Sequence, residues 1–120
     1  MTDQTLDSYY RIITGGIDAY GEGAELAPLL ADDLVFEGPL AGHVTGAARF
    51  LQGVRGFVAN VGAVDVIQRL EAPGEAAVLY DAELPKGTVR FAEFFTLSGG
   101  RIQSLRLQYD PAAYLAAGGA

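Results

Sequence analysis

Apolar residues recur at three- and four-residue spacing through the first twenty positions, which places them on one face of a helix. These positions are Leu6, Tyr9, Tyr10, Ile13, Ile17 and Tyr20. Gly21 follows them as a natural helix stop. The pattern predicts one helix that ends near Tyr20 and contains Gly15 and Gly16 in its interior.

Two further helical segments are expected before residue 62. A short one covers about Glu25 to Leu30, with Pro28 in its first turn. A longer amphipathic helix of about four turns follows, with Thr45 as its N-cap. Its apolar positions are Phe50, Val54, Phe57, Val58 and Val61. Between the two segments, residues 34–38 predict a brief strand that Gly38 and Pro39 end, and His43 falls in the loop that follows.

After Gly62 the apolar period changes from about 3.6 to two, which is typical of strands. Four strands are expected around Val64–Leu70, Val78–Leu84, Ala92–Thr96 and Leu105–Tyr109. Short turn-forming segments connect them, so the strands form an antiparallel meander. Asp110 and Pro111 then begin a short helical tail, residues 111–120, which we expect to fray near Gly118.

Helices that precede a run of antiparallel strands indicate the α+β class. We expect one domain over residues 1–120, in which three N-terminal helices cover a strongly curved, mostly antiparallel sheet. Such an arrangement would enclose a cone with an internal pocket.

Composition excludes several kinds of chemistry and partner. The chain contains no cysteine, which removes disulfides and thiolate sites, and one histidine makes a metal site improbable. A net charge of −7 disfavours nucleic acid and anionic lipid surfaces. The sequence has no apolar run long enough for a membrane span and no phosphate-binding loop, so we expect a cytoplasmic protein without a cofactor.

The order of elements, with LADDLVFEGP and the closing GGRIQSLRLQYD, resembles the nuclear transport factor 2-like superfamily. The closest resemblance is to its SnoaL-like and ketosteroid isomerase-like members, and it covers nearly the whole chain. It implies a cone-shaped, cystatin-like fold, frequent homodimers, and a deep pocket for steroids, polyketides, terpenes or similar molecules.

The catalytic residues of these relatives transfer poorly to this chain. The isomerase base would stand just before the proline that ends the first strand, where this chain has Gly38. The oxyanion-stabilising acid would fall on Ala92, and its tyrosine partner near Thr14, with Tyr10 a turn earlier. The acid of SnoaL-type cyclases has no counterpart in the last strand, residues 104–107. The resemblance therefore implies the fold and a pocket without the isomerase's own mechanism.

Strand alternation divides the charged residues from the expected pocket wall. We expect Asp81, Glu83, Glu93 and Arg106 outside, because unpaired buried ions cost several kcal/mol each, roughly. Phe91 and Phe95 flank Glu93, and exposed aromatic residues beside charges are typical of a subunit interface. The sequence therefore predicts a homodimer through the outer sheet face. Its residues would be Phe91, Glu93, Phe95 and Arg106, with Arg106 paired to Glu93 or Glu83.

The inner face then offers few groups for chemistry. Tyr109 and Tyr80 could donate to a carbonyl or epoxide oxygen, and His43 at the rim could act as a general base. The structural alternatives are core tyrosines and an exposed histidine. The expected lining comprises Tyr10, Ile13, Ile17, Phe36, Gly38, Phe50, Val54, Phe57, Ala82, Leu84, Ala92, Phe94, Leu105 and Leu107.

Three functions remain open on these observations. The first is an enzyme such as an isomerase, cyclase, dehydratase or epoxide hydrolase that acts on a small hydrophobic molecule. The second is a non-catalytic pocket for an apolar ligand, and the third is an interaction module. If Glu93 and Arg106 both faced the cavity, a hydrolase would take priority.

Overall fold

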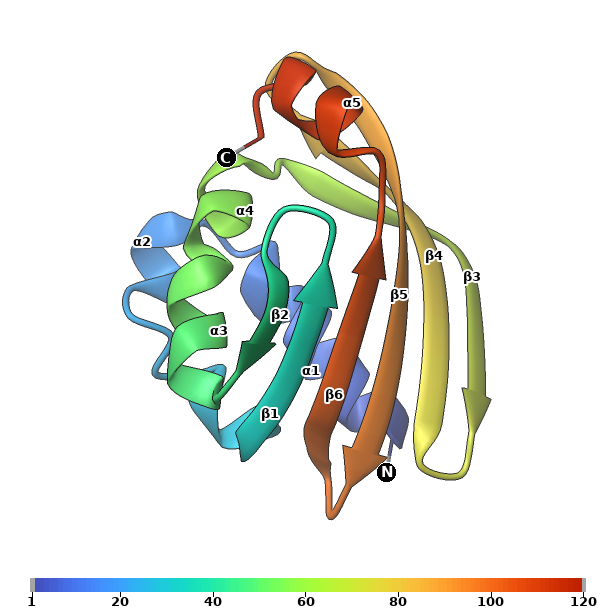
Figure 1. Cartoon of the computed structure of the whole chain (residues 1–120). Coiled ribbons are helices and arrows are strands. Elements are labelled where there is room, and N and C mark those ends of the chain that lie inside the picture. The colour runs from blue at the N-terminus through green and yellow to red at the C-terminus, as the bar shows by residue number, and fades with distance from the viewer. Residues whose placement is uncertain (1, 120) are drawn as a thin grey trace.

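The computed structural model describes residues 2–119, and it consists of a curved sheet with most of its helices on one face (Figure 1). The strands are β1 (Leu30–Gly38), β2 (Gly42–Thr45), β3 (Ala63–Ala72), β4 (Glu75–Leu84), β5 (Gly87–Ser98) and β6 (Arg101–Gln108). The helices are α1 (Thr2–Ile13), α2 (Ile17–Tyr20), α3 (Ala47–Gly53), α4 (Arg55–Asn60) and α5 (Pro111–Ala116), with a 3₁₀ turn η1 (Ala27–Leu29). The α+β class predicted from the sequence is confirmed.

The six strands form an open sheet in the order β2-β1-β6-β5-β4-β3. The meander β3-β4-β5-β6 is antiparallel as expected, and β1 joins it by pairing parallel to β6. Figure 1 shows the long strands bending around α1, with α3 and α4 beside the short β1–β2 hairpin.

The first helix is shorter than its apolar pattern predicts. α1 ends at Ile13, and Gly16 adopts a φ of 93°, which is in the left-handed region that glycine tolerates. The chain turns there and restarts as the four-residue α2. The two interior glycines therefore break the predicted helix, although Leu6, Tyr9 and Ile13 lie in the core as the pattern requires.

The helix expected after Thr45 is also divided in two. Gly46, rather than Thr45, precedes α3, and the chain passes through Val54 before α4 begins at Arg55. β1 is longer than the strand expected over residues 34–38, since it starts at Leu30. His43, expected in a loop, lies in β2 opposite Glu37.

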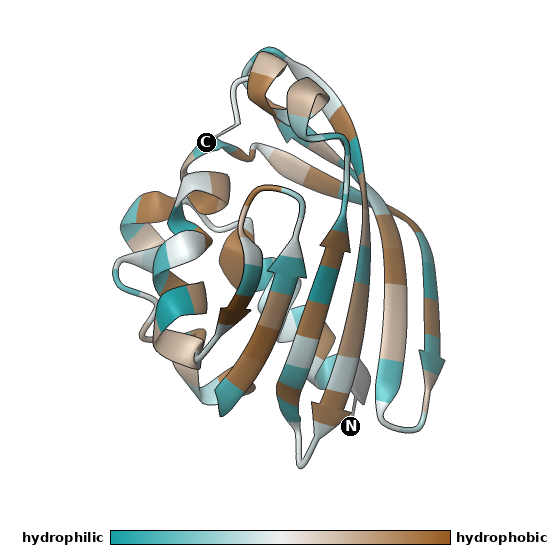
Figure 2. Ribbon diagram, viewed as in Figure 1, coloured by the Kyte–Doolittle hydropathy of each residue, from teal (hydrophilic) through white to brown (hydrophobic). Residues whose placement is uncertain are grey.

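The register of β5 reverses one inference from strand alternation. Tyr80 of β4 pairs with Phe91, and Val78 pairs with Glu93, so these residues share the inner face. Phe94 lies on the outer face and is 48% exposed, while Phe91, Glu93 and Phe95 are buried. Figure 2 shows this alternation of hydrophobic and hydrophilic bands along the strands.

The C-terminal segment starts as the sequence predicts. The Asp110 side chain accepts hydrogen bonds from the backbone N–H groups of Ala112 and Ala113, which confirms the cap, and Pro111 occupies the first turn. Tyr114 of α5 is buried. Residue 120, the end of the tail that we expected to fray, lies outside the described residues, as does residue 1.

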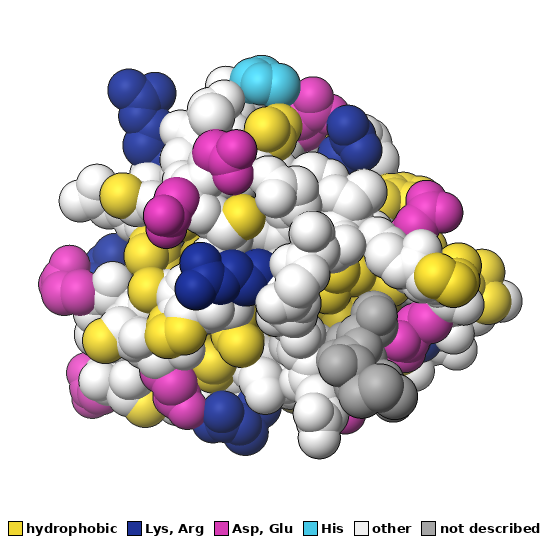
Figure 3. Space-filling model, turned by 90° about the horizontal axis from the view of Figure 1, so that it is seen from below, with side chains coloured by type: hydrophobic (Ala, Val, Ile, Leu, Met, Phe, Trp, Pro, Cys, Tyr) yellow, Lys and Arg dark blue, Asp and Glu magenta, His cyan; other side chains and the backbone are white. Residues whose placement is uncertain are grey.

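The surface carries charges of both signs among exposed apolar side chains. Figure 3 shows acidic and basic groups spread around one side of the molecule, with hydrophobic atoms between them. Across residues 2–119, no helix has the length and apolar character that a bilayer crossing requires.

Candidate functional site

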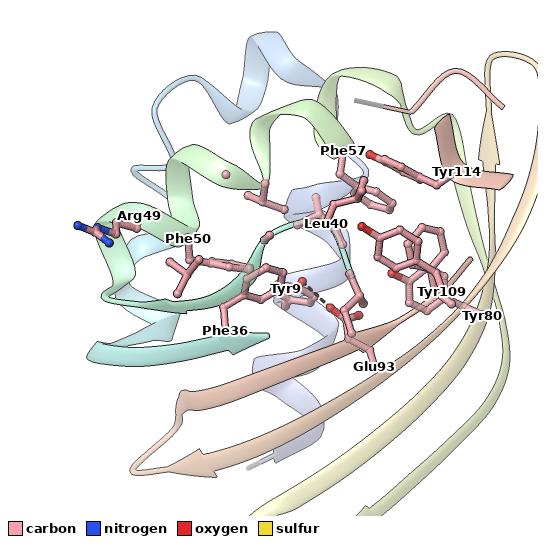
Figure 4. Close-up of a pocket in the computed structure, with 17 residues that line it drawn as sticks. Tyr9, Phe36, Leu40, Arg49, Phe50, Phe57, Tyr80, Glu93, Tyr109 and Tyr114 are labelled. Atoms are coloured by element: carbon pink, nitrogen blue, oxygen red, sulfur yellow. Dashed lines mark hydrogen bonds between the residues drawn. The ribbon is translucent and has the colours of Figure 1, made fainter. Parts of the chain in front are cut away.

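A cavity of about 300 Å³ lies between the bent sheet, α1, the α3–α4 segment and the β1–β2 turn. Figure 4 shows its side chains converging from these elements. The lining residues are Tyr9, Ile13, Phe36, Leu40, Ala41, Val44, Arg49, Phe50, Gly53, Val54, Phe57, Tyr80, Phe91, Glu93, Leu107, Tyr109 and Tyr114. Most of them are apolar or aromatic, as is typical of sites for small organic molecules.

Glu93 is the carboxylic acid of this cavity. It projects from β5 and is 2% exposed. The hydroxyl of Tyr9 donates to Glu93 Oε2 at 2.8 Å, and the hydroxyl of Tyr10 donates to Oε1 at 2.6 Å. Because Tyr9 and Tyr10 are neighbours on α1, one turn of that helix holds both carboxylate oxygens.

Burial and hydrogen bonding act on Glu93 in opposite directions. Burial disfavours the charged form and raises the pKa, while the Tyr10, Tyr9 and Tyr80 hydroxyls favour the charged form. The net result raises the pKa of Glu93 from 4.5 to about 7. The pKa values of Tyr9 and Tyr80 are raised by their own burial and by the Glu93 charge, so both phenols stay protonated. Glu93 can therefore exchange a proton near neutral pH while its phenol partners act as donors.

Aromatic rings form a continuous wall along one side of the cavity. Tyr80 and Phe91 stack with centroids 5.3 Å apart and planes within 6°. The ring centroid of Tyr109 lies 4.7 Å from that of Phe91, and the ring centroid of Tyr114 lies 5.2 Å from that of Tyr109. Figure 4 shows Glu93 beside this wall. The carboxyl group thus faces an aromatic environment.

Several residues expected at the pocket do line it. They are Tyr80 and Tyr109, both candidates for chemistry, and Ile13, Phe36, Phe50, Val54, Phe57 and Leu107. Burial raises the pKa of Tyr109, and the Leu40 backbone acts in the opposite direction. The catalytic roles of the two tyrosines remain predictions.

Other expected lining residues lie elsewhere. Ala92 and Phe94 are on the outer face, because the odd-numbered residues Phe91, Glu93 and Phe95 of β5 point inward, and the even-numbered ones were expected to do so. Ile17 lies beyond the Gly16 break on α2, and Gly38 lies at the end of β1. Ala82, Leu84 and Leu105 are buried in the packed core instead of lining the cavity. The ring of Tyr10 does not line it either, although its hydroxyl reaches Glu93.

His43 is far less enclosed than a general base at this cavity would be. Its side chain is 61% exposed and does not line the cavity. His43 Nδ1 lies 3.0 Å from Glu37 Oε2, and Arg106 Nε donates to Glu37 Oε1 at 2.9 Å. Arg106 therefore pairs with Glu37, not with Glu93 or Glu83 as expected. Glu37 lies on the outer face, in the same cross-strand row as Arg106 and Phe94.

The interface residues inferred from the sequence are mostly internal. Phe91, Glu93 and Phe95 are at most 2% exposed within one chain, so they cannot form an outer contact surface. Arg106 is on the outer face, where it stands opposite Phe94 in the β5–β6 register. The homodimer itself remains a prediction, and of the four residues named for it only Arg106 lies on the outer face.

Sequence reasoning missed Glu93 and Tyr9 as site residues. A usable signal was present in the β4–β5 turn. Leu84 pairs with Gly87, which leaves a two-residue loop of Pro85 and Lys86. A two-residue hairpin loop fixes the register, and here it pairs Tyr80 with Phe91. The same register places Val89, Phe91, Glu93 and Phe95 inside.

The described residues do not group into a metal site. Across residues 2–119, no three side chains of the His, Asp or Glu type gather to hold a metal ion. The polar groups that the lining supplies are one carboxyl group, several phenols and the guanidinium group of Arg49. The site is therefore equipped to bind an organic molecule and to move a proton.

Comparison with known proteins identifies the family to which this fold belongs. Residues 13–105 match the SnoaL-like domain, so the chain belongs to that family. A protein from Kribbella flavida is 26% identical over 95% of this chain and 90% of its own, with a TM-score of 0.81. No curated protein matches the sequence.

Two further solved structures share the fold. A nuclear transport factor 2-like protein of unknown function from Cytophaga hutchinsonii is 19% identical over 96% of this chain and 95% of its own, with a TM-score of 0.75. A steroid delta-isomerase from Pseudomonas aeruginosa is 17% identical over 97% of this chain and 84% of its own, with a TM-score of 0.76. The SnoaL-like membership inferred from the sequence is confirmed by the family match over residues 13–105, and these two structures show the same fold.

Proposed function

We propose that this protein is a small-molecule isomerase that moves a proton between two carbons of an unsaturated carbonyl compound. Glu93 would carry the proton. The supporting observation is a single buried carboxyl group that lines an apolar cavity and has a pKa of about 7. A general base is most effective when its pKa lies near the working pH. The fold shared with a steroid delta-isomerase supports the same reaction class.

The proposed reaction converts a β,γ-unsaturated ketone into its α,β-unsaturated isomer. The Glu93 carboxylate takes a proton from the carbon between the carbonyl and the alkene, and the C–H electrons form a dienolate. The carboxyl group then returns that proton to the γ-carbon, and the carbonyl re-forms with the double bond in conjugation. Atoms and electrons balance without a co-reactant.

The other cavity groups take supporting roles in this proposal. Tyr9 and Tyr10 hold the two carboxylate oxygens in place. Tyr109, whose ring lines the cavity, would donate a hydrogen bond to the dienolate oxygen. His43 receives no role, because it lies outside the cavity. The mechanism differs from a ketosteroid isomerase in having no base before Pro39, since Glu93 itself would move the proton.

The size of the cavity favours a small substrate. A volume of about 300 Å³ lies at the lower end of the range for ligand pockets, about 300–1,000 Å³. Monocyclic ketones therefore suit it better than four-ring steroids. We expect turnover of 3-cyclohexen-1-one to exceed that of bicyclic and tetracyclic enones.

The test is the absorbance rise that accompanies conversion of 3-cyclohexen-1-one to 2-cyclohexen-1-one. Glu93→Gln should lower kcat/KM by at least about 100-fold, the usual contribution of a positioned acid–base group. Glu37→Gln is the matched control on the outer face and should retain turnover. Circular dichroism of each variant checks the fold. Undiminished turnover in Glu93→Gln would overturn the proposal.

A non-catalytic binding pocket is the alternative. It is favoured by the hydrogen bonds that already hold both Glu93 oxygens, since a purely structural buried acid has the same partners. Saturable binding of the enone series with no turnover in the unmodified protein would establish that alternative. A hydrolase that uses Glu93 with Arg106 is not proposed, because Arg106 lies on the opposite face of the sheet.

A further inference from the structure

We propose that the cavity also binds compact organic ammonium ions. The ammonium group would lie against the Glu93 carboxylate, and the hydrocarbon part would lie against the aromatic wall formed by Tyr80, Phe91 and Tyr109. This site would serve amines, whereas the proposed isomerisation acts on neutral ketones. The inference rests on the geometry of the cavity and does not require the proposed reaction.

The first argument is the missing counter-charge. The groups that stabilise the Glu93 carboxylate are the hydroxyls of Tyr9, Tyr10 and Tyr80, which are neutral. A buried carboxylate is normally paired with a cation, because neutral donors offset only part of the lost hydration. A ligand with a positive charge would supply the missing partner.

Neither arginine near the cavity supplies that charge. Arg69 of β3 pairs with Val78 of β4, which in turn pairs with Glu93 of β5. The backbones of Arg69 and Glu93 are therefore two strand spacings apart, or about 10 Å. Its guanidinium pairs with Asp7 at 2.7 Å and with Glu71 at 2.8 Å. Arg49 lines the rim, and Figure 4 shows its side chain pointing away from Glu93.

The carboxylate also retains acceptor capacity. Two carboxylate oxygens offer about four lone-pair sites in total. Tyr9 occupies one lone-pair site on Oε2, and Tyr10 occupies one on Oε1. The Tyr80 hydroxyl also stabilises the carboxylate and accounts for at most one more site. At least one site therefore remains for an N–H donor, and Glu93 forms part of the cavity wall where such a donor would enter.

The aromatic wall complements the rest of an ammonium ligand. A cation within about 6 Å of a ring centroid is attracted by the ring's electron-rich face, and the attraction grows when water is excluded. Tyr80, Phe91 and Tyr109 provide three neighbouring rings with centroid separations of 5.3 and 4.7 Å. A carboxylate beside several rings is an arrangement that favours an ammonium ion over a neutral molecule of the same shape.

Access and the overall field agree with this ligand class. Leu40 of the β1–β2 turn lines the cavity and is 49% exposed, so the cavity wall reaches the surface there. The chain carries a net charge of −7, which raises the local concentration of cations over that of anions. The cavity volume corresponds to about ten water molecules, so a ligand of about ten non-hydrogen atoms or fewer would fit.

Calorimetry with cyclohexylammonium and cyclohexanol tests the inference on the unmodified protein. The two probes have the same ring and differ in charge. We expect cyclohexylammonium to bind at least tenfold more tightly at pH 8. Its affinity should fall as the pH drops below about 7, because Glu93 becomes protonated. Glu93 is contacted by Tyr10, and the other ionisable groups that face the cavity are Tyr9, Tyr80, Tyr109, Tyr114 and Arg49. Phenols and guanidinium groups normally keep their protons between pH 6 and pH 8, roughly, so the change in affinity would report on Glu93.

Matched variants locate the charge that the amine recognises. Glu93→Gln should remove the preference for cyclohexylammonium over cyclohexanol, while Glu37→Gln, which removes an outer carboxylate, should keep it. Equal affinity for the two probes, or a preference that survives in Glu93→Gln, would overturn the inference. The probe comparison and the pH series need no variant, so a misfolded Glu93→Gln would leave the test decisive.

The two proposals fail separately. Glu93-dependent turnover of 3-cyclohexen-1-one together with equal affinity for both probes would overturn amine binding alone. Charge-selective binding in a protein that turns over no enone would overturn the isomerase alone.

Discussion

Two glutamates on opposite faces of the same sheet respond to their surroundings in opposite ways. Glu93 on the inner face accepts two tyrosine hydrogen bonds, and its pKa is raised to about 7. Glu37 on the outer face also accepts two hydrogen bonds, from His43 and Arg106, and its pKa is lowered. Hydrogen bonds favour the charged form of both carboxyl groups, so hydrogen bonding alone cannot explain why the two pKa values shift in opposite directions.

Burial and the charge of the partners explain it. Glu37 lies in water beside a guanidinium group and an imidazole, and both favour its charged form. Glu93 is buried beside neutral phenols, so lost hydration outweighs the hydrogen bonds that it gains. A carboxyl group becomes a candidate for acid–base chemistry here because its donors are neutral and water is excluded.

The largest predicted effect concerns stability against pH. The folded-state pKa of Glu93 is about 7 against 4.5 ordinarily, so its contribution is fully present below pH 4.5 and is lost as the pH rises through 7. Integrated over that range, the loss is on the order of 3 kcal/mol. Denaturant unfolding at pH 5 and pH 8 should show this difference between the unmodified protein and Glu93→Gln.

Glu37→Gln provides the control of opposite sign. The folded-state pKa of Glu37 is lowered, so its stabilising contribution is present above the ordinary value of 4.5 and is lost as the pH falls. Its effect should be much smaller than that of Glu93, because both partners are exposed and screened by water. The same sign for both variants would contradict the comparison.

A smaller effect is expected when one neutral donor is removed. Tyr10→Phe deletes the 2.6 Å hydrogen bond to Glu93 Oε1, which favours the charged form. The midpoint of the pH profile of kcat/KM should therefore rise by about one pH unit, the equivalent of one charge-assisted hydrogen bond. Tyr109→Phe is the control. It should lower kcat by about 100-fold and leave the midpoint unchanged. A midpoint that moved in Tyr109→Phe alone would reverse the assigned roles.

Most of the fold was predictable because its signals are local. The period-two alternation after Gly62 and the cap at Asp110 depend on residues close in sequence, and both appear in the structure as expected. The positions of Gly15 and Gly16 also signalled a weakness in the first helix. There the apolar stripe through Ile17 suggested continuity that the Gly16 backbone does not permit.

The site was harder to predict because its stabilising contacts are distant in sequence. Glu93 is tolerated inside because Tyr9 and Tyr10 reach it from 84 and 83 residues away. Without those partners a charged residue belongs on the surface. Placing Glu93 outside on that assumption assigned its neighbours on β5 to the wrong faces of the sheet as well. His43 was overestimated as a site residue, because its partner is Glu37, six residues away in sequence and outside the cavity.

The next prediction concerns the outer face as a contact surface between two copies. Phe94 is 48% exposed there and pairs across strands with Ala77 and Arg106. If the expected homodimer uses this face, Phe94→Lys should lower the solution mass to that of one chain, because it adds a charge beside Arg106. Stability of the fold should change by less than about 1 kcal/mol. Phe94→Leu keeps the face apolar and should keep the mass, as measured by light scattering. A mass unaffected by Phe94→Lys would remove Phe94 from the interface.

The smallest effect is expected at His43, and it tests whether the outer charges influence the cavity at all. His43→Ala removes one of the two partners of Glu37 and leaves the Arg106 hydrogen bond in place. Neither His43 nor Glu37 lines the cavity. The Glu93 pKa is raised by burial and lowered in part by hydrogen bonds from tyrosines on α1 and β4. Turnover should therefore stay within about twofold of the unmodified protein, with the same pH midpoint, because exposed charges are screened by water. A loss of turnover as large as that expected for Glu93→Gln would return His43 to the role of general base. It would also show that the two faces of the sheet are coupled, against the separation that the two glutamates indicate.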